Sequence, residues 1–289
     1  MKNIHYRGRF APSPSGALHF GSLVAALGSF LRARHCQGLW LVRIEDIDPP
    51  REVHGAADDI LRTLEAFGLH WDQQVIYQSQ RHHDYQDQIA DWLAHQQAYY
   101  CQCSRQQIRS RGGIYNGHCR QQQLDSGAIR WVNNQGCDHF IDQLQGPIHT
   151  DAAFAKEDFI IRRSDGFYAY QLAVVMDDIA AGITEVVRGA DLLEATVRQI
   201  SLFNALNAAV PDWLHLPLAC QGPGSKLSKQ NHATPVDKSH PQPALNAALA
   251  FLGQPQVEPC GEVALMIHQA IAQFDLESIP KQKEILLPQ

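Results

Sequence analysis

Two separated segments of the chain contain residue types that suit the handling of phosphate groups. Residues Arg9–Ser22 are expected to form the end of a strand, a turn rich in Pro, Gly and Ser, and the start of a helix at His19. Backbone amides at a helix start attract anions, and Gly16 and Gly21 let a ligand approach the backbone closely. Much later, Lys226-Leu-Ser-Lys229 places two ammonium groups and a hydroxyl in a loop. Each segment alone is also typical of an ordinary turn or a solvated basic loop, but together they predict that the chain handles a nucleotide triphosphate.

A cysteine-rich segment forms a candidate metal site. Cys101-X-Cys103 is followed by Cys119, which has His118 directly before it. Closely spaced thiolates with a second ligand pair on a later loop suit tetrahedral Zn²⁺, and we expect one structural ion. His118 is chemically a good donor, but adjacent residues seldom bind the same ion, so the fourth ligand stays open at this point. The alternative is three unrelated reduced cysteines.

Two adjacent acids, Asp177 and Asp178, follow the apolar run Leu172–Met176, which we expect to be a strand. Such a pair is suited to binding Mg²⁺ or contacting adenosine, and equally to capping the next turn. The sequence leaves these alternatives open.

The spacing of apolar residues predicts alternating strands and helices. Residues 4–10 alternate as a first strand, and Ser22–Arg34 repeats its apolar residues with helical spacing. Leu39–Ile44 is expected to be a buried parallel strand, with Glu45 and Asp48 at its carboxyl end, where ligands bind in open α/β sheets. Further helices are expected at 57–67, 81–97, 191–206, 243–252 and 262–274, and a further strand at 184–187. This order predicts an α/β fold.

The composition changes along the chain and predicts three parts. Residues 1–84 and 166–222 carry the α/β pattern of a catalytic domain. Residues 85–165 include a stretch rich in Cys, Arg, Gln and Gly without clear periodicity, which indicates an inserted module with the zinc site. Residues 223–289 hold the lysine-containing loop and a short helical region.

The bulk composition is that of an ordinary globular protein. The chain has 289 residues, of which 45% are hydrophobic and 19% charged. The first twenty residues lack a secretory pattern, and the apolar runs are too short to cross a bilayer, so we expect a cytoplasmic protein with no membrane partner. We also expect a monomer. Seven cysteines, an odd count, argue against a disulfide framework. The net charge of −6 does not indicate nucleic-acid binding, although local arginine clusters permit it.

The two phosphate-handling segments resemble the signature motifs of class I aminoacyl-tRNA synthetases. His19-Phe-Gly-Ser22 is similar to the motif HIGH, with Ser22 in place of the second histidine, and Lys226-Leu-Ser-Lys229 is similar to KMSKS, with Leu for Met and Gln for the last Ser. The resemblance implies a Rossmann-like catalytic domain in which Lys229, supported by Lys226, neutralises charge developing on the triphosphate. The residues implied to be catalytic are His19, Lys226 and Lys229. The residues implied to bind ATP, which acts with Mg²⁺, are His19, Gly21, Ser22 and Lys229.

Further segments are similar to glutamyl-tRNA synthetases, namely Arg9-Phe-Ala-Pro-Ser-Pro-Ser-Gly16, Arg43-Ile-Glu-Asp-Ile-Asp48 and Val186-Val-Arg-Gly-Ala-Asp-Leu192. Glutamate carries two carboxylates and one ammonium, so its pocket needs two guanidinium groups and an acidic partner. The resemblance implies that Arg9 and Arg188 each bind a carboxylate, in an order left open, and that Glu45 holds the ammonium. A surface salt bridge for Arg188 and a helix cap for Glu45 are the alternatives. The glutamate-binding residues implied are Arg9, Ala11, Ser13, Glu45, Tyr170 and Arg188.

The end of the chain and the cysteine pattern narrow the resemblance. The chain ends soon after Lys229, so we expect no anticodon-binding domain of the kind that full glutamyl-tRNA synthetases carry. The chain also resembles the glutamyl-queuosine tRNA(Asp) synthetases, whose Cys-X-Cys and Tyr-X₃-Cys pattern favours Tyr115 over His118 as the fourth zinc ligand, beside Cys101, Cys103 and Cys119. This resemblance implies activation of L-glutamate by ATP and transfer to the queuosine base in the anticodon of tRNA(Asp). The alternatives are a compact synthetase that charges a tRNA 3′ end and an inactive regulatory paralogue that binds tRNA or glutamate.

Overall fold

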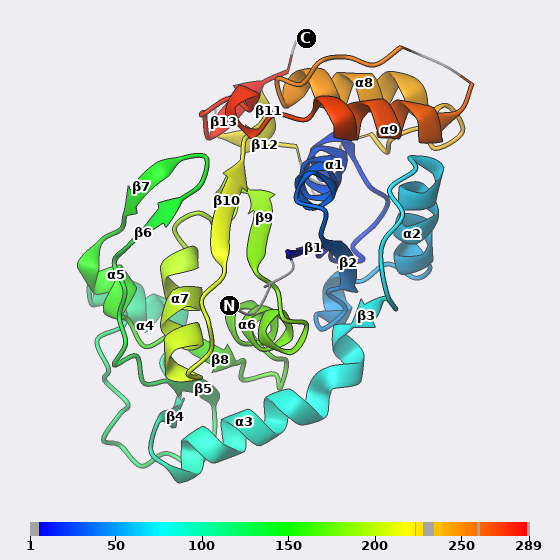
Figure 1. The fold of residues 1–289 in the computed structure, drawn as a ribbon. Coiled ribbons are helices and arrows are strands. Elements are labelled where there is room, and N and C mark those ends of the chain that lie inside the picture. The colour runs from blue at the N-terminus through cyan, green and yellow to red at the C-terminus, as the bar shows by residue number, and fades with distance from the viewer. Residues whose placement is uncertain (1–5, 223, 228–233, 259–260, 288–289) are drawn as a thin grey trace, which may run out of the picture.

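The structure is a computed structural model that describes residues 6–222, 224–227, 234–258 and 261–287. Its centre consists of two groups of strands (Figure 1). The first is parallel with the order β1-β2-β3, where the strands are β1 (Arg7–Phe10), β2 (Leu39–Ile44) and β3 (Ile76–Tyr77). The second has the order β7-β6-β10-β9, where the strands are β6 (His139–Asp142), β7 (Gly146–His149), β9 (Glu185–Gly189) and β10 (Asp212–Leu216). The amide of Thr184 donates to the carbonyl of Arg7 at 2.9 Å, which joins the groups between β1 and β9 and confirms the α/β prediction.

Helix α1 (Phe20–His35) connects β1 to β2 and carries the largest share of one core. Its apolar residues at helical spacing, such as Leu23, Leu27 and Leu31, are fully buried. On one side α1 covers β1 and β2, where Phe30 meets Trp40 edge-on. On the other side it packs against α8 (Pro241–Phe251) and α9 (Val263–Gln273), as Figure 1 shows. The predicted helices in these regions are confirmed.

The prediction of a strand at Leu172–Met176 is wrong, because this run is the middle of helix α6 (Tyr170–Ala180). Helix α6 packs against α3 (His82–Ala94) and α7 (Thr196–Ala205), and its residues 172–175 are fully buried. A helix that is enclosed on several sides shows no polar stripe, so a short apolar run does not distinguish it from a buried strand. Asp177 and Asp178 consequently lie inside a helix and not at the end of a strand.

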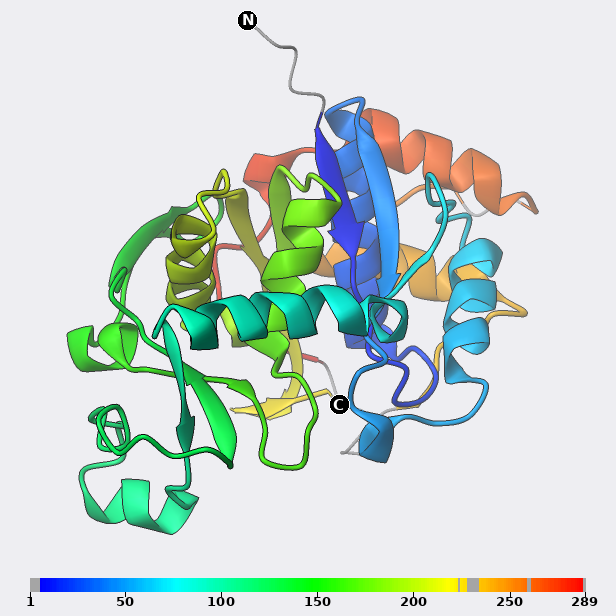
Figure 2. The same cartoon turned by 90° about the horizontal axis from the view of Figure 1, so that it is seen from below.

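A small antiparallel sheet with the order β4-β5-β8 lies at one end of the molecule. Its strands are β4 (Ala98–Cys101), β5 (Ala128–Trp131) and β8 (Ile160–Arg162), and the short helices α4 (Arg105–Ser110) and α5 (Ala152–Lys156) belong to the same stretch of chain. Figure 2 shows α3 running across the molecule toward this sheet. The hairpin of β6 and β7, which comes between β5 and β8 in sequence, instead pairs with β10.

One further helix, one further sheet and several short turns complete the described fold. Helix α2 (Ala56–Ala66) follows β2, and a sheet with the order β12-β11-β13 contains β11 (Leu218–Gly222), β12 (Ser225–Lys226) and β13 (Glu284–Leu286). Short 3₁₀ turns occupy 49–51, 78–81, 190–192 and 276–278, and the third of these explains why α7 begins later than predicted. Within the described ranges, no helix has both the length and the apolar character that a membrane span requires.

The pairing of β1 with β2 depends on Gly38, which precedes β2. A Cβ atom at this position would overlap the carbonyl oxygen of Tyr6, and that oxygen accepts the 2.9 Å hydrogen bond from Leu39. We predict that Gly38→Ala lowers the free energy of unfolding by about 1–3 kcal/mol, because backbone must move to relieve the overlap. Urea unfolding measures this change. Gly222→Ala is the matched control, since nothing lies within 4 Å of its added methyl; equal unfolding midpoints for the two variants would contradict the prediction.

Candidate active site and metal cluster

One cavity of about 510 Å³ lies at the carboxyl ends of β1, β2 and β9 and at the start of α1. The structure brings together in its lining the following residues that the sequence predicted: Arg9, Ala11, Ser13, His19, Gly21, Ser22, Glu45, Tyr170 and Arg188. Buried Leu227 of the lysine segment lines the same cavity, and its amide donates to the carbonyl of Ala219 at 2.8 Å. Lys229 and the side chain of Lys226 lie outside the described residues. Side chains distant in sequence meet here because parallel strands place their carboxyl ends at one edge.

His19 directly precedes α1 and lines the cavity. It is the N-cap of the helix, and its Nδ1 accepts from the amide of Ser22 at 3.3 Å. The hydroxyl of Ser22 lies 3.1 Å from Nε2 of the same ring. Gly21 lies between them, and a Cβ there would come within 3.2 Å of the His19 ring. Ser22 thus occupies the position of the second histidine of the HIGH motif and contacts His19, which occupies the position of the first.

The Arg9 side chain is held by a buried ion pair. Its Nε donates to Asp178 at 3.2 Å, and both side chains are almost fully buried. Arg43, to which the sequence analysis assigned no role, donates to the same carboxylate at 2.5 Å and to Glu45 at 3.2 Å. Arg43 is 1% exposed, so these partners replace the water that its charge loses. The signal that could have identified Arg43 is an arginine inside the otherwise apolar strand 39–44.

The two acids left open by the sequence have structural partners. Asp177 accepts from Gln78 at 2.7 Å, from Arg81 at 2.6 Å and from the Tyr85 hydroxyl at 2.7 Å. Asp178 joins Arg9 and Arg43. Neither acid is among the residues that line the cavity. Their place in buried ion pairs differs from all three roles considered for them, which were Mg²⁺ binding, adenosine contact and turn capping.

Burial and the arginines shift the pKa values of the acids in opposite directions. Burial tends to raise the pKa of Asp178, but the Arg43 and Arg9 guanidiniums outweigh burial and hold it below its ordinary value. Burial dominates at Glu45 and raises its pKa, although the same two arginines oppose this effect. Burial also raises the pKa of Tyr170, which keeps its hydroxyl neutral and able to donate. The cavity therefore offers guanidinium and hydroxyl donors beside one desolvated carboxylate.

Arg188 is 6% exposed, so the alternative of a surface salt bridge is wrong. Its Nε donates to the ring of His215 at 3.0 Å, and its terminal nitrogens donate to Gln199 and Thr196, each at 2.8 Å. Tyr170 accepts a longer contact at 3.4 Å. His215 was not predicted to belong to the site, although a histidine inside the apolar strand 212–216 was the available signal.

The three cysteines of the candidate metal site come together. The sulfurs of Cys101, Cys103 and Cys119 all lie within 4.8 Å of one another. Tetrahedral Zn²⁺ with Zn–S bonds of roughly 2.3 Å places its sulfurs roughly 3.8 Å apart, so the donor set fits this ion. The hydroxyl of Tyr115 accepts from the amide of Cys119 at 2.8 Å, whereas His118 is exposed and lies 2.9 Å from the Gln122 side chain. The geometry places Tyr115, and not His118, at the cluster.

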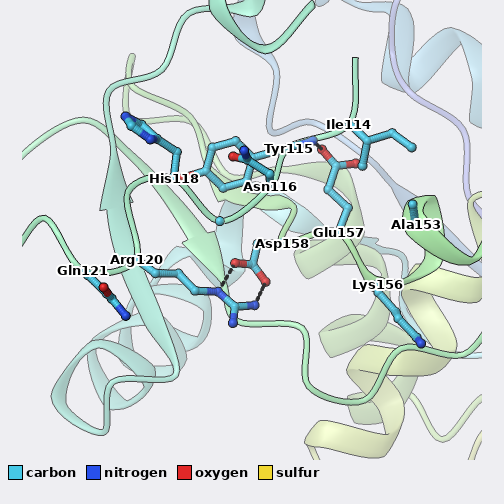
Figure 3. A pocket seen from close by; sticks show the side chains of 11 residues that line it. Ile114, Tyr115, Asn116, His118, Arg120, Gln121, Ala153, Lys156, Glu157 and Asp158 are labelled. Carbon is cyan, nitrogen blue, oxygen red and sulfur yellow. Dashed lines mark hydrogen bonds and ion pairs between the residues drawn. The ribbon is translucent and has the colours of Figure 1, made fainter. Parts of the chain in front are cut away.

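A second cavity, of about 660 Å³, lies beside this cluster and was not predicted (Figure 3). Arg120 and Asp158 face each other there and form two contacts of 2.6 and 2.5 Å. Asp158 also accepts from the Tyr99 hydroxyl at 2.6 Å and from the amide of Asn133 at 2.9 Å. This carboxylate therefore ties the cysteine-containing loop to β4 and to the residues that follow β5.

Comparison with known proteins agrees with this architecture. The family model of the catalytic domain of class I tRNA synthetases (E and Q) matches residues 5–259. The glutamyl-Q tRNA(Asp) synthetase of Shewanella amazonensis is 64% identical over 99% of this chain and 99% of the relative. The protein of the same name from Escherichia coli is 56% identical over 97% of this chain and 92% of the relative. The chain belongs to the glutamyl-Q tRNA(Asp) synthetase family.

Solved structures of related synthetases show the same fold as this member of the glutamyl-Q tRNA(Asp) synthetase family. The glutamate tRNA ligase from Elizabethkingia meningosepticum, in complex with its amino acid, matches with a TM-score of 0.77 at 25% identity; the match covers 96% of this chain and 66% of that chain. Glutamate-tRNA synthetase from Elizabethkingia anophelis has a TM-score of 0.78 at 24% identity and covers 96% and 67%. The class I catalytic domain expected from the sequence motifs is confirmed.

The depressed pKa of Asp178 makes a testable prediction about acid stability. A group whose pKa is lower in the folded than in the unfolded state stabilises the fold above its unfolded pKa of about 3.9, and this contribution disappears as the pH falls through the folded value. We predict that Asp178→Asn lowers the free energy of unfolding at pH 7 by about 3–5 kcal/mol, because Arg9 and Arg43 lose a buried partner. The loss should shrink toward pH 3.

Urea unfolding at a series of pH values measures this dependence. Asp212→Asn is the matched control, because Asp212 is exposed at the start of β10, and it should leave the profile unchanged. A loss for Asp178→Asn that is equal at pH 7 and pH 3 would contradict the assigned ion pairs.

Proposed function

We propose that the chain activates L-glutamate with ATP and transfers the glutamyl group to the queuosine base in the anticodon of tRNA(Asp). The observation that carries this proposal is the cavity in which two buried arginines, one desolvated carboxylate and the start of α1 meet. Relatives that match this chain almost from end to end are named glutamyl-Q tRNA(Asp) synthetase. The name of these relatives and the charges of the cavity both support glutamate as the substrate.

In the binding step, Arg9 and Arg188 each take one carboxylate of glutamate. Guanidinium groups bind carboxylates with two parallel hydrogen bonds, and a buried site strengthens such contacts. Glu45 pairs with the α-ammonium. Burial disfavours the ionised form of the Glu45 carboxylate, and the positive charge of the ammonium stabilises that form. The Tyr170 hydroxyl and the turn residues Ala11 and Ser13 complete the lining.

In the activation step, the α-carboxylate oxygen attacks the α-phosphorus of ATP, and pyrophosphate leaves with the electron pair of the broken P–O bond. The amides at the start of α1, together with His19 and Ser22, hold the phosphates. Lys229 and Lys226, as their motif implies, neutralise the charge that develops on the triphosphate. Mg²⁺ bound to ATP supplies further neutralisation.

In the transfer step, a hydroxyl of the queuosine cyclopentenediol attacks the carbonyl carbon of glutamyl-adenylate. An ester bond forms, the bond between the carbonyl carbon and the phosphate oxygen breaks, AMP leaves with its electron pair, and the hydroxyl proton passes to solvent. The transfer step is supported by the relatives named glutamyl-Q tRNA(Asp) synthetase, because the match to the Shewanella amazonensis protein covers 99% of this chain and 99% of that relative.

We further propose that Zn²⁺ stabilises an inserted module at residues 85–165. The catalytic domain then consists of residues 1–84 and 166–222, and the lysine loop and helical region follow at residues 223–289. Cys101, Cys103, Cys119 and Tyr115 would hold the ion. Arg130 supports this set, since its Nε donates to the Cys101 sulfur at 3.2 Å and its guanidinium stacks 3.7 Å from the centre of the Tyr115 ring. These contacts hold the Cys101 sulfur and the Tyr115 ring in place at the cluster.

We predict that the protein exchanges labelled pyrophosphate into ATP when glutamate is present and tRNA is absent. It should then transfer labelled glutamate to tRNA(Asp) that contains queuosine. The reason is that activation needs only the cavity, whereas transfer needs the hydroxyl of the queuosine ring.

The control is tRNA(Asp) that lacks queuosine, which should accept no glutamate. Equal transfer to both tRNAs, or transfer to the 3′ end detected by nuclease mapping, would indicate ordinary charging of a tRNA. The absence of exchange would indicate an inactive paralogue.

For the metal site we predict one zinc ion per chain, measured by mass spectrometry of metal content. Cys119→Ser should remove the ion because it removes a thiolate, and Tyr115→Phe should make the ion easier to extract with a chelator. His118→Ala is the matched control and should retain zinc as the parent protein does. Loss of zinc in His118→Ala with full retention in Tyr115→Phe would show that the fourth ligand is His118.

A further inference from the structure

Behind Arg188 lies a pair of buried side chains, Asp142 and His215, that none of the steps above uses. The exposed fractions of these two residues are 1% and 0%. Nδ1 of His215 lies 2.6 Å from an oxygen of Asp142, and its Nε2 lies 3.0 Å from Nε of Arg188. The three residues come from β6, β10 and β9, which are neighbours in this order, and His215 is directly opposite Arg188 in the sheet register (Figure 1). The line of contacts therefore runs across the sheet toward the cavity.

The partners fix the position of the proton on the His215 ring. An arginine Nε–H can only donate, so Nε2 of His215 must accept, and the proton of the neutral ring must lie on Nδ1. There it is donated to Asp142. Burial lowers the pKa of His215 to about 4 although Asp142 opposes the shift, so the ring is neutral near pH 7.

The orientation of Asp142 is fixed as well. Its oxygen Oδ1 accepts from the backbone amides of Leu144 at 3.0 Å and Gln145 at 2.8 Å, and more weakly from the amide of His215 at 3.3 Å. Because backbone amides occupy this oxygen, the other oxygen, Oδ2, is the one that faces His215. The carboxylate is consequently an acceptor on both sides.

The other direct contacts of Arg188 are also to uncharged acceptors. Its terminal nitrogens donate to Gln199, Thr196 and Tyr170. The carbonyl oxygen of Gln199 is turned toward Arg188 because its amide group donates to Gln171 at 2.8 Å. The guanidinium is thus held in place by groups that do not neutralise its charge.

We propose that Asp142 and His215 are positioning residues for Arg188: Asp142 keeps the proton on Nδ1 of His215, and the bare Nε2 holds the guanidinium in the orientation that meets a carboxylate of glutamate. This inference rests on the proposed function, in which Arg188 binds the substrate.

The decisive variant is Asp142→Asn, which keeps the shape of the side chain. The new amide oxygen must take the place of Oδ1, since backbone amides donate there, so the new NH₂ group faces Nδ1. Nδ1 then accepts, the ring proton moves to Nε2, and it confronts the Nε–H of Arg188. We expect the KM for glutamate in tRNA-free pyrophosphate exchange to rise roughly tenfold or more, while the KM for ATP changes by less than about twofold.

A spectroscopic measurement tests the same step without activity. In protein with ¹⁵N-labelled histidine, the signals that disappear in His215→Gln identify His215. The parent should show a proton on Nδ1 and Asp142→Asn a proton on Nε2. Asp72→Asn is the matched control, because Asp72, like Asp142, accepts from a side chain and from a backbone amide (Arg34 at 2.7 Å and Trp40 at 2.8 Å) but does not line the cavity. This control should leave both KM values and the His215 signals unchanged.

The outcomes separate the inference from the proposed function. If the parent shows no glutamate-dependent exchange, the proposed function fails, whereas the ¹⁵N signals still report the tautomer. An unchanged tautomer in Asp142→Asn, or a changed tautomer with an unchanged KM for glutamate, overturns the positioning role. If Asp142→Asn folds poorly, His215→Gln, whose amide oxygen can accept from Arg188, should keep a lower KM for glutamate than His215→Leu; equal values overturn the inference.

Discussion

The structure depends on how buried positive charge is compensated at the carboxyl ends of β1 and β2. Arg9 and Arg43 lie on these neighbouring strands, and both donate to Asp178 of α6. Two guanidiniums in an interior of low dielectric repel each other and lose their hydration, so they are tolerated only with a carboxylate between them. Helix α6 must dock on the strands for this arrangement to form. The position of α6 and the shape of the cavity are therefore set by the same ion pairs.

The two arginines that line the cavity are held in different ways, and the difference matters for ligand binding. Arg9 already has a carboxylate partner, whereas the side chains that accept from Arg188 are uncharged. Two acids near Arg188, Asp178 and Asp191, favour its charged form through space. The side chains that accept hydrogen bonds from Arg188 are nevertheless uncharged, so a carboxylate of glutamate meets less competition for hydrogen bonds at Arg188 than at Arg9.

Much of the site could be predicted from the sequence, because its residues follow strand ends or begin a helix and therefore converge in a parallel sheet. Helix α1 was predictable because its apolar residues repeat at helical spacing over several turns between a Gly-Ser start and a basic end, while α6 was not, because its apolar run is short and fully buried. The partners behind the site were not predictable. Asp142 and His215 meet because β6 and β10 are neighbours, and the order of strands in a sheet is a long-range property that local sequence patterns do not contain. The cysteine spacing predicted the cluster, and the resemblance favoured Tyr115 over His118; the structure adds that the Tyr115 hydroxyl contacts Cys119 whereas His118 is exposed.

The use of a neutral imidazole between Asp142 and Arg188 has a physical reason. A carboxylate in direct contact with Arg188 would hold the guanidinium firmly, but it would also compete with the carboxylate of the substrate for the same charge. With His215 between them, Asp142 lies one ring farther from the cation and still determines which ring nitrogen accepts. Burial keeps the His215 ring neutral. A protonated ring would place the Nε2–H donor against the Nε–H donor of Arg188. The fully buried position of His215 in the centre of the sheet is therefore part of how the site keeps one arginine fixed and yet available to an anion.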